Sequence, residues 1–258
     1  MLTREDILSA LEKSLKPIDK VYALWEAGAA AFNRLDQYSD IDLMVDVQDD
    51  FVAKTWEVIE STLLDLSPID LRFELPQPAW HGHSQVFYRL ENASPFLFVD
   101  ALVMQHSASN KFLEVDQHGT ARVLFDKLGV TQPPAFDPQA LHLKLYKQVQ
   151  QMKVTFDLFQ VETTKELKRG NNIEAISFYY ASTIRPLVEL LRIRYMDVPA
   201  RHKFYTRYIQ YDLPIEVVEK LGKLFFVSDA ADLVVKHHQA GEWFHQVMQA
   251  LELGEYIK

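Results

Sequence analysis

Two aspartates one residue apart are the clearest chemical feature of the chain. Asp40 and Asp42 lie in the stretch SDIDLMV, where apolar residues alternate with the acids. Because side chains of a β-strand alternate between its two faces, both carboxylates project from one face of the expected strand. Two such carboxylates repel each other unless a cation compensates them, and their oxygens are ligands that suit Mg²⁺. The pair therefore predicts either a strand with an acidic solvent face or a platform for metal ions.

A glycine precedes this pair, at the end of another apolar run. Gly28 closes the stretch KVYALWEAG, which reads as a buried strand. Without a Cβ atom, its backbone N–H groups can approach a phosphate closely. The following residues, AAAFNR, predict a helix whose N-terminus would point at the anion. Phosphates at Gly28 and metal ions at Asp40 and Asp42 would form one continuous site.

The spacing from Gly28 to the stretch YSDIDLMV resembles the signature of the nucleotidyltransferase superfamily, which includes the aminoglycoside nucleotidyltransferases and DNA polymerase β. That signature is a strand, a Gly-Ser pair, a helical linker, an acid–apolar–acid strand and a later third acid. The resemblance covers roughly residues 18–104. It implies an enzyme that moves a nucleoside monophosphate, AMP from ATP, onto a hydroxyl of a small-molecule acceptor, with pyrophosphate leaving.

The same resemblance implies roles for individual residues. Asp40 and Asp42 would hold two Mg²⁺ ions, and Gly28, Ala29 and Ser39 would contact the nucleotide. The family usually has serine after the glycine, whereas this chain has Ala29 and lacks that hydroxyl donor. The alternative function is therefore a catalytically impaired nucleotide-binding or regulatory protein of the same fold.

Two positions fit the third carboxylate of the family. Asp100 lies in the apolar stretch FLFVDALVM, where an acid is costly and requires a reason. Asp70 lies in PIDLRF beside Pro68, where an exposed acid is unremarkable. We expect Asp100 to bind the metal near the attacking hydroxyl and to take its proton, with Asp70 as the alternative ligand.

The second half of the chain offers basic candidates for phosphate contacts. Lys203 and Arg207 lie among tyrosines in the stretch PARHKFYTRYIQYDLP, a pattern that suits nucleotide binding or an ordinary connection between helices. Arg185 and Glu189 are four residues apart and can pair on a helix. The alternative is that an arginine of this helix reaches the triphosphate. His81 and His83 are expected to shape a loop at the mouth of the site.

The chain changes character near Gly129, where three prolines follow within ten residues. Residues 1–130 predict an α+β nucleotidyltransferase domain, a small mixed β-sheet with flanking helices. Residues 131–258 predict an all-α helical bundle. Expected strands are centred on residues 20–27, 40–47, 68–75, 85–90 and 95–104, and expected helices on 3–16, 51–66, 138–169, 172–195, 214–226 and 229–251.

Composition narrows the class of partner. The net charge of −9 disfavours nucleic acid, which requires many basic contacts, and suits a small ligand, particularly a cationic one. The chain has no cysteine, and no apolar run has the roughly 20 residues that cross a bilayer. We therefore expect a cytoplasmic protein without disulfides or membrane spans. Its oligomeric state is left open.

Overall fold

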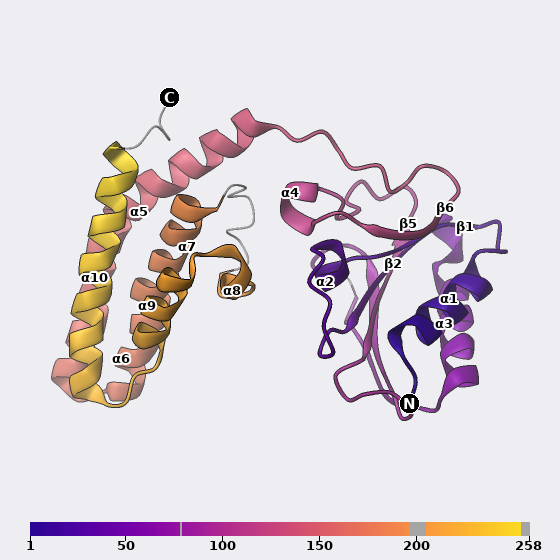
Figure 1. Cartoon of the computed structure of the whole chain (residues 1–258), viewed down its shortest axis with the longest axis horizontal. Coiled ribbons are helices and arrows are strands. Elements are labelled where there is room, and N and C mark those ends of the chain that lie inside the picture. The colour runs from indigo at the N-terminus through magenta and orange to yellow at the C-terminus, as the bar shows by residue number, and fades with distance from the viewer. Residues whose placement is uncertain (78, 197–204, 254–258) are drawn as a thin grey trace. The chain divides into compact units, whose positions relative to one another are not determined.

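The computed structural model describes residues 1–77, 79–196 and 205–253. The chain divides into two compact units, Met1–Phe136 and Asp137–Lys258, which are described in turn (Figure 1). The first combines a sheet with helices and the second is helical, so the predicted α+β class is confirmed.

The N-terminal unit is built on one mixed six-stranded sheet with the order β3-β4-β5-β2-β1-β6. Strands β2 and β5 pair in parallel, and every other neighbouring pair is antiparallel. The strands are β1 (Val21–Glu26), β2 (Ile41–Val47), β3 (Ile69–Glu74), β4 (Ser84–Leu90), β5 (Val99–Gln105) and β6 (Arg122–Asp126).

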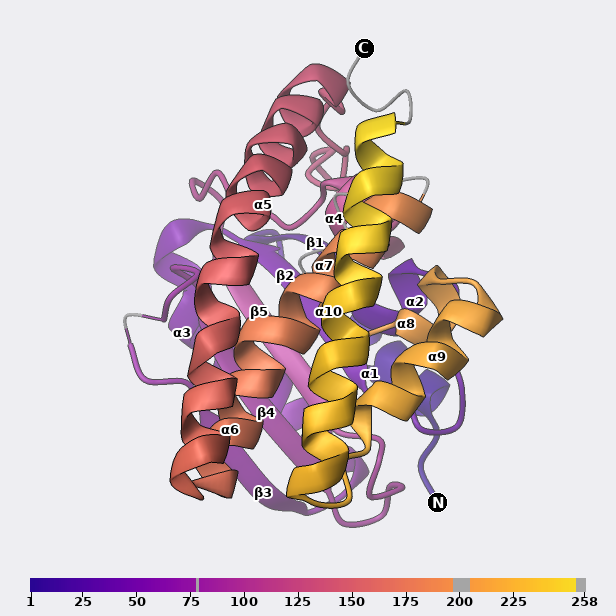
Figure 2. The ribbon, with the colours of Figure 1, turned by 90° about the vertical axis from the view of Figure 1, so that its left-hand side faces the viewer.

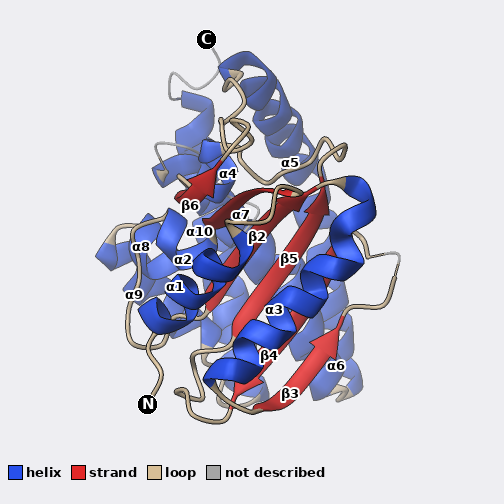
Figure 3. Ribbon diagram, turned by 90° about the vertical axis from the view of Figure 1, so that its right-hand side faces the viewer, coloured by secondary structure: helices blue, strands red, loops and turns tan. Residues whose placement is uncertain are grey.

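Two helices cover one face of this sheet (Figure 3). They are α1 (Arg4–Leu15) and α3 (Val52–Leu66), which a 3-10 turn at Asp49–Phe51 precedes. The Thr3 side chain and the Asp6 carboxylate cap α1 reciprocally. Between helices and sheet lies the main core of this unit, which includes Ile7, Leu11, Ile41, Leu43, Ile59 and Val99.

The opposite face of the sheet carries a smaller apolar cluster. Its buried members are Ala23, Trp25, Leu102, Met104 and Leu113. Two single-turn helices, α2 (Gly28–Ala31) and α4 (Val115–His118), belong to connections of this unit. Side chains alternate along β2 and β5. Odd-numbered residues therefore face α1 and α3, and even-numbered residues face the side of this smaller cluster.

The C-terminal unit is a bundle with its own core. Helix α5 (Pro138–Arg169) begins at the Asp137 cap and ends at Gly170, which adopts a left-handed conformation. In Figure 2 it runs beside α10 (Ala230–Leu253), and the rings of Phe156 and Phe244 stack at 3.6 Å between them. The other helices are α6 (Asn172–Phe178), α7 (Arg185–Tyr195), α8 (Ile209–Asp212) and α9 (Ile215–Phe225).

Three local differences from the expectations have physical reasons. A π-helical turn, Tyr179–Ile184, interrupts the helix expected over residues 172–195. Pro186 follows it and has no N–H, so the Ser182 carbonyl oxygen, four residues earlier, accepts from Gln160 Nε2 at 2.9 Å instead. Strand β6 was not expected, because it is short and only partly apolar. The helix expected after Gly28 is a single turn. Within the described residues, no helix is long and apolar enough to cross a membrane.

Candidate functional site

The acids Asp42 and Asp100 lie side by side on the two parallel strands. They are register partners in the β2–β5 pairing, so their side chains leave the sheet on the same face. This is the face of Met44 and Leu102, not the one covered by α1 and α3. Asp40 lies one residue before β2, and its carbonyl oxygen accepts from Arg4. The fold thus brings the three predicted carboxylates to one end of two central strands.

Gly28 touches the side chain of Asp42. Its φ is +52°, and a Cβ atom added to it would lie 1.6 Å from Oδ2 and 2.4 Å from Cγ of Asp42. The Ala27 N–H donates to the Asp42 carbonyl oxygen at 2.8 Å, which holds the two segments together. No other residue type fits at this position without moving the carboxylate. The glycine and the acidic strand therefore form one packed unit, as their spacing indicated.

The loop after Gly28 is held by residues that the sequence did not single out. Helix α2 is one turn long, so the expected helix N-terminus contributes little dipole. Gly119 lies against it at a φ of +79°, and its added Cβ would meet the Ala31 carbonyl oxygen at 2.6 Å. The Thr120 N–H donates to that same oxygen at 2.9 Å. No local sequence pattern could have linked Gly119 to a segment almost ninety residues earlier.

A network of ion pairs and hydrogen bonds, on the face of the sheet that α1 and α3 cover, fixes the start of β2. Arg4 bonds to the carboxylate of Glu26 and to the carbonyl oxygens of Ser39, at 2.9 Å, and Asp40. Glu26 is fully buried and also accepts from Arg122 at 3.1 Å. Burial raises the pKa of Glu26, and the two arginines oppose that rise. The guanidinium of Arg4 therefore links α1, the end of β1 and the residue that carries the first acid.

The alternative third acid, Asp70, lies elsewhere. Strand β3 is at the edge of the sheet, with β4 and β5 between it and β2. Arg89 on β4 donates to Asp70 through Nε and Nη2, at 2.6 to 3.1 Å. These hydrogen bonds hold the pKa of Asp70 below its ordinary value. Of the two positions, only Asp100 is a neighbour of Asp42.

The other predicted nucleotide contacts are spread over both units. Ser39 forms a turn with Asp36, whose carboxylate accepts from the Ser39 hydroxyl at 2.9 Å. Ala29 is part of α2, where its carbonyl oxygen accepts from the Arg34 N–H. Arg207 belongs to the helical unit, with its guanidinium over the ring of Tyr208 at 5.1 Å. Lys203 lies outside the described residues.

Comparisons with known proteins give structural matches only. No model of a known protein family matches the chain, and no curated protein sequence matches it. An aminoglycoside 6-adenyltransferase from Bacillus subtilis matches with a TM-score of 0.38 and 11% identity, over 100% of this chain and 93% of that chain. A spectinomycin adenyltransferase from Enterococcus faecialis, solved with ATP and spectinomycin, matches with a TM-score of 0.36 and 8% identity, over 97% and 100%.

Both structural matches extend over nearly the whole chain, sheet unit and helices alike. Similarity at these TM-scores carries no functional argument.

The donor chemistry of the acidic face suits Mg²⁺, which prefers carboxylate oxygens. As they stand, however, no three His, Cys, Asp or Glu side chains among the described residues are gathered closely enough to hold a metal ion. The side chains fit such an ion by type and by face. Binding would require the carboxylates to turn toward one another.

Gln85 is a neighbour of Asp100 that the sequence interpretation missed. It lies on β4, on the same face, and its amide nitrogen donates to Asp100 Oδ1 at 2.5 Å. Its amide oxygen is 3.0 Å from His81 Nε2. The alternation of SQVFYRL predicts that Gln85 faces away from the main core, but not which acid it meets.

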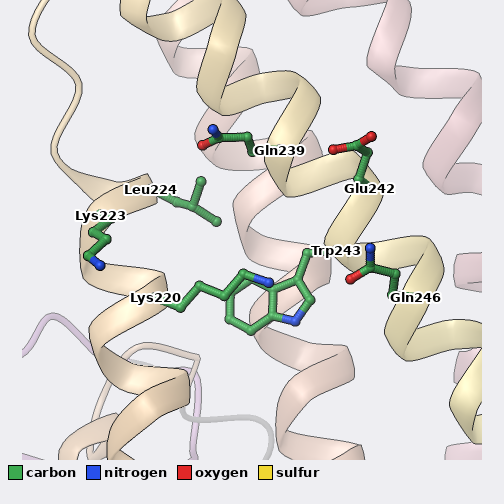
Figure 4. A pocket seen from close by; sticks show the side chains of 7 residues that line it. All are labelled: Lys220, Lys223, Leu224, Gln239, Glu242, Trp243 and Gln246. Atoms are coloured by element: carbon green, nitrogen blue, oxygen red, sulfur yellow. The ribbon is translucent and has the colours of Figure 1, made fainter.

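A cavity of about 330 Å³ lies between α9 and α10 of the helical unit. Figure 4 shows Lys220 extended along the indole of Trp243, and its Nζ lies 4.0 Å from the ring centroid. Burial lowers the pKa of this lysine. Among the described residues that line the cavity, Glu242 is the only acid, so these residues offer no set of metal-binding carboxylates. Its lysine and tryptophan are accounted for by their mutual cation–π contact.

Proposed function

We propose that this chain is a Mg²⁺-dependent nucleotidyltransferase that moves AMP from ATP onto a hydroxyl of a small-molecule acceptor. The observation that carries the proposal is the register pairing of Asp42 with Asp100 on parallel strands, with Asp40 two residues before Asp42. Two further facts support it. Gly28 packs its backbone against Asp42, and the gapped motif resembles that of the superfamily.

In this mechanism the three carboxylates divide the work. Asp40 and Asp42 would hold Mg²⁺, which when bound supplies positive charge to the phosphate oxygens. Asp100 would lie near the acceptor hydroxyl and take its proton as the oxygen attacks the α-phosphorus. The backbone at Gly28, free of a Cβ atom, would leave room for the phosphates beside Asp42. Pyrophosphate is the leaving group.

The acceptor is best sought among small hydroxylated cations. The chain carries 36 acidic and 27 basic side chains, which attracts cations and disfavours nucleic acid. This property concerns the whole chain, so it narrows the class of acceptor without naming one. Aminoglycosides are a suitable first panel.

The direct test is pyrophosphate release from ATP and Mg²⁺ over an acceptor panel. Asp42→Asn keeps the shape of the side chain and removes its charge, so we expect at least a 100-fold loss of transfer. Asp70→Asn is the matched control, since Asp70 is an acid of the same sheet with two strands between it and β2, and it should keep near-normal activity. An Asp42→Asn protein that is folded and fully active would contradict the proposal.

A second candidate is a nucleotide-binding or regulatory protein without transferase activity. Ala29 favours it, because the usual hydroxyl donor after the glycine is missing. Isothermal titration with ATP and Mg²⁺ separates the two functions. Binding without pyrophosphate release for any acceptor would support the second candidate.

A further inference from the structure

A directed chain of hydrogen bonds ends on Asp100. Gln85 Nε2 donates to Asp100 Oδ1 at 2.5 Å, and Gln85 Oε1 lies 3.0 Å from His81 Nε2. His81 Nδ1 in turn accepts from the backbone N–H of His83 at 3.1 Å. These three contacts join a strand, a loop and the carboxylate that we assign to the acceptor hydroxyl.

The direction of each bond follows from what the groups can donate. A carboxylate only accepts, so the amide nitrogen of Gln85 must face Asp100. The amide oxygen then faces His81 and can only accept, so His81 Nε2 must carry a proton. Because His81 Nδ1 accepts from a backbone N–H, it carries none. His81 is therefore neutral and held in one tautomer, and the Gln85 amide has one orientation.

The end of this series of hydrogen bonds that is remote from Asp100 is anchored by a buried residue, His83. His83 is 4% exposed, and its Nε2 donates to the Asn110 carbonyl oxygen at 2.9 Å. Its ring stacks near that of His81, at 5.6 Å, and both rings contact Phe112 edge-on. Burial lowers the pKa of His83, which keeps this anchor neutral. The loop that holds His81 is thus fixed by packing.

We propose that Gln85 and His81 are positioning residues for Asp100, which hold its carboxylate in the orientation required for transfer. This role rests on the proposed function. Gln85 orients Asp100 directly, and His81 prevents the Gln85 amide from turning over. A reversed amide would present its oxygen to Asp100 and repel it. Hydrogen-bond partners of this kind are worth about 10–100-fold in activity at metal-dependent sites.

Two substitutions isolate the bond to Asp100. Gln85→Leu removes both hydrogen bonds, and Gln85→Glu keeps the shape and the acceptor for His81 but cannot donate to Asp100. We expect both to lower kcat about 10–100-fold and to leave the KM for ATP within about threefold. His81→Phe should lower kcat less, since the amide can still adopt its correct orientation part of the time. Gln105→Leu, at the exposed end of β5, is the matched control and should change neither constant.

A measurement independent of activity tests the geometry. The ¹⁵N chemical shifts of the His81 ring should report a protonated Nε2 and an unprotonated Nδ1 in the wild type. Gln85→Leu should shift the Nε2 signal, because the bond to Gln85 Oε1 is lost, whereas the His83 N–H still keeps Nδ1 unprotonated. Gln105→Leu should leave both signals unchanged. A His81 ring protonated at Nδ1 in the wild type, or shifts unchanged by Gln85→Leu, would overturn the proposed chain of bonds.

The outcomes separate this inference from the proposed function. An active wild type whose Gln85→Leu and Gln85→Glu variants keep full kcat overturns the positioning role and leaves the transferase proposal intact. A wild type that binds ATP and Mg²⁺ but transfers to no acceptor overturns both. A loss of kcat in both Gln85 variants, with unchanged melting temperatures and the expected His81 shifts, supports the role.

Discussion

At the scale of single residues, the contact between Gly28 and Asp42 is the tightest constraint in the candidate site. Gly28→Ala would add a methyl group 1.6 Å from Asp42 Oδ2 and would also strain a φ of +52°. We expect at least a 100-fold loss of transfer, together with about 1–2 kcal/mol of stability lost to the left-handed backbone. Pyrophosphate release and urea unfolding measure the two effects separately.

Gly129→Ala is the control that separates strain from contact. Gly129 has a φ of +74°, but no atom lies within 4 Å of its added Cβ. This variant should therefore lose a similar amount of stability and keep its activity. Equal activity in the two variants would mean that the position of the Asp42 carboxylate does not matter for transfer.

Some residues of the candidate site could be predicted from the sequence, and others could not. The pairing of Asp40 with Asp42 follows from strand alternation, which is local, and their spacing from Gly28 follows a known motif. The choice between Asp70 and Asp100 depends on strand order, because both acids lie in plausible strands. Gln85 and Gly119 act through contacts with segments distant in sequence. Such contacts leave no periodic signal to read.

At the scale of elements, the start of β2 depends on α1. Arg4 is the first residue of that helix, and it reaches Glu26 and the carbonyl oxygens of Ser39 and Asp40. Most helices and strands were predictable because each shows its own period of apolar residues. The link between α1 and the acidic strand was not, since an arginine at a helix start is ordinary in sequence.

Arg4→Met should therefore weaken both the fold and the activity. Glu26 would remain buried with only Arg122 to compensate it, so we expect a loss of about 3 kcal/mol in the free energy of unfolding. In the double variant Arg4→Met/Glu26→Gln the uncompensated charge is gone, and part of that stability should return. Transfer should stay low in both, because the donor to Ser39 and Asp40 is absent in both.

Urea unfolding and pyrophosphate release distinguish these effects. Lys16→Met, which removes an exposed pair with Glu12 near the end of α1, is the control and should cost less than about 1 kcal/mol. Recovery of full activity in the double variant would show that Arg4 only stabilises the fold and has no role in placing Asp40.

At the scale of the whole molecule, each unit has a core of its own. The buried clusters of the sheet unit include residues from Ile7 to Phe125, and that of the helical unit runs from Met152 to Leu251. The periodicity of the sequence changes near Gly129, a few residues before the first unit ends at Phe136. The sequence did not show which role each arginine of α7 has. One of them is buried, although arginines are rarely buried in proteins.

Arg192 is that buried arginine, and we expect it to stabilise the helical unit. Its side chain is fully buried and donates to Asp212 at 2.8 Å and to the Tyr205 carbonyl oxygen at 2.7 Å, which joins α7 to α8. Arg192→Met keeps the volume but leaves a buried carboxylate without this partner, so about 3–5 kcal/mol should be lost. Arg185→Met removes a surface pair with Glu189 and a cation–π contact with the Tyr205 ring, and should cost only about 1 kcal/mol. Hydrogen-exchange mass spectrometry should show faster exchange in α7, α8 and α9 and unchanged protection in the six strands. Equal loss of protection in the sheet would mean that stability is shared between the two units and not held within each core.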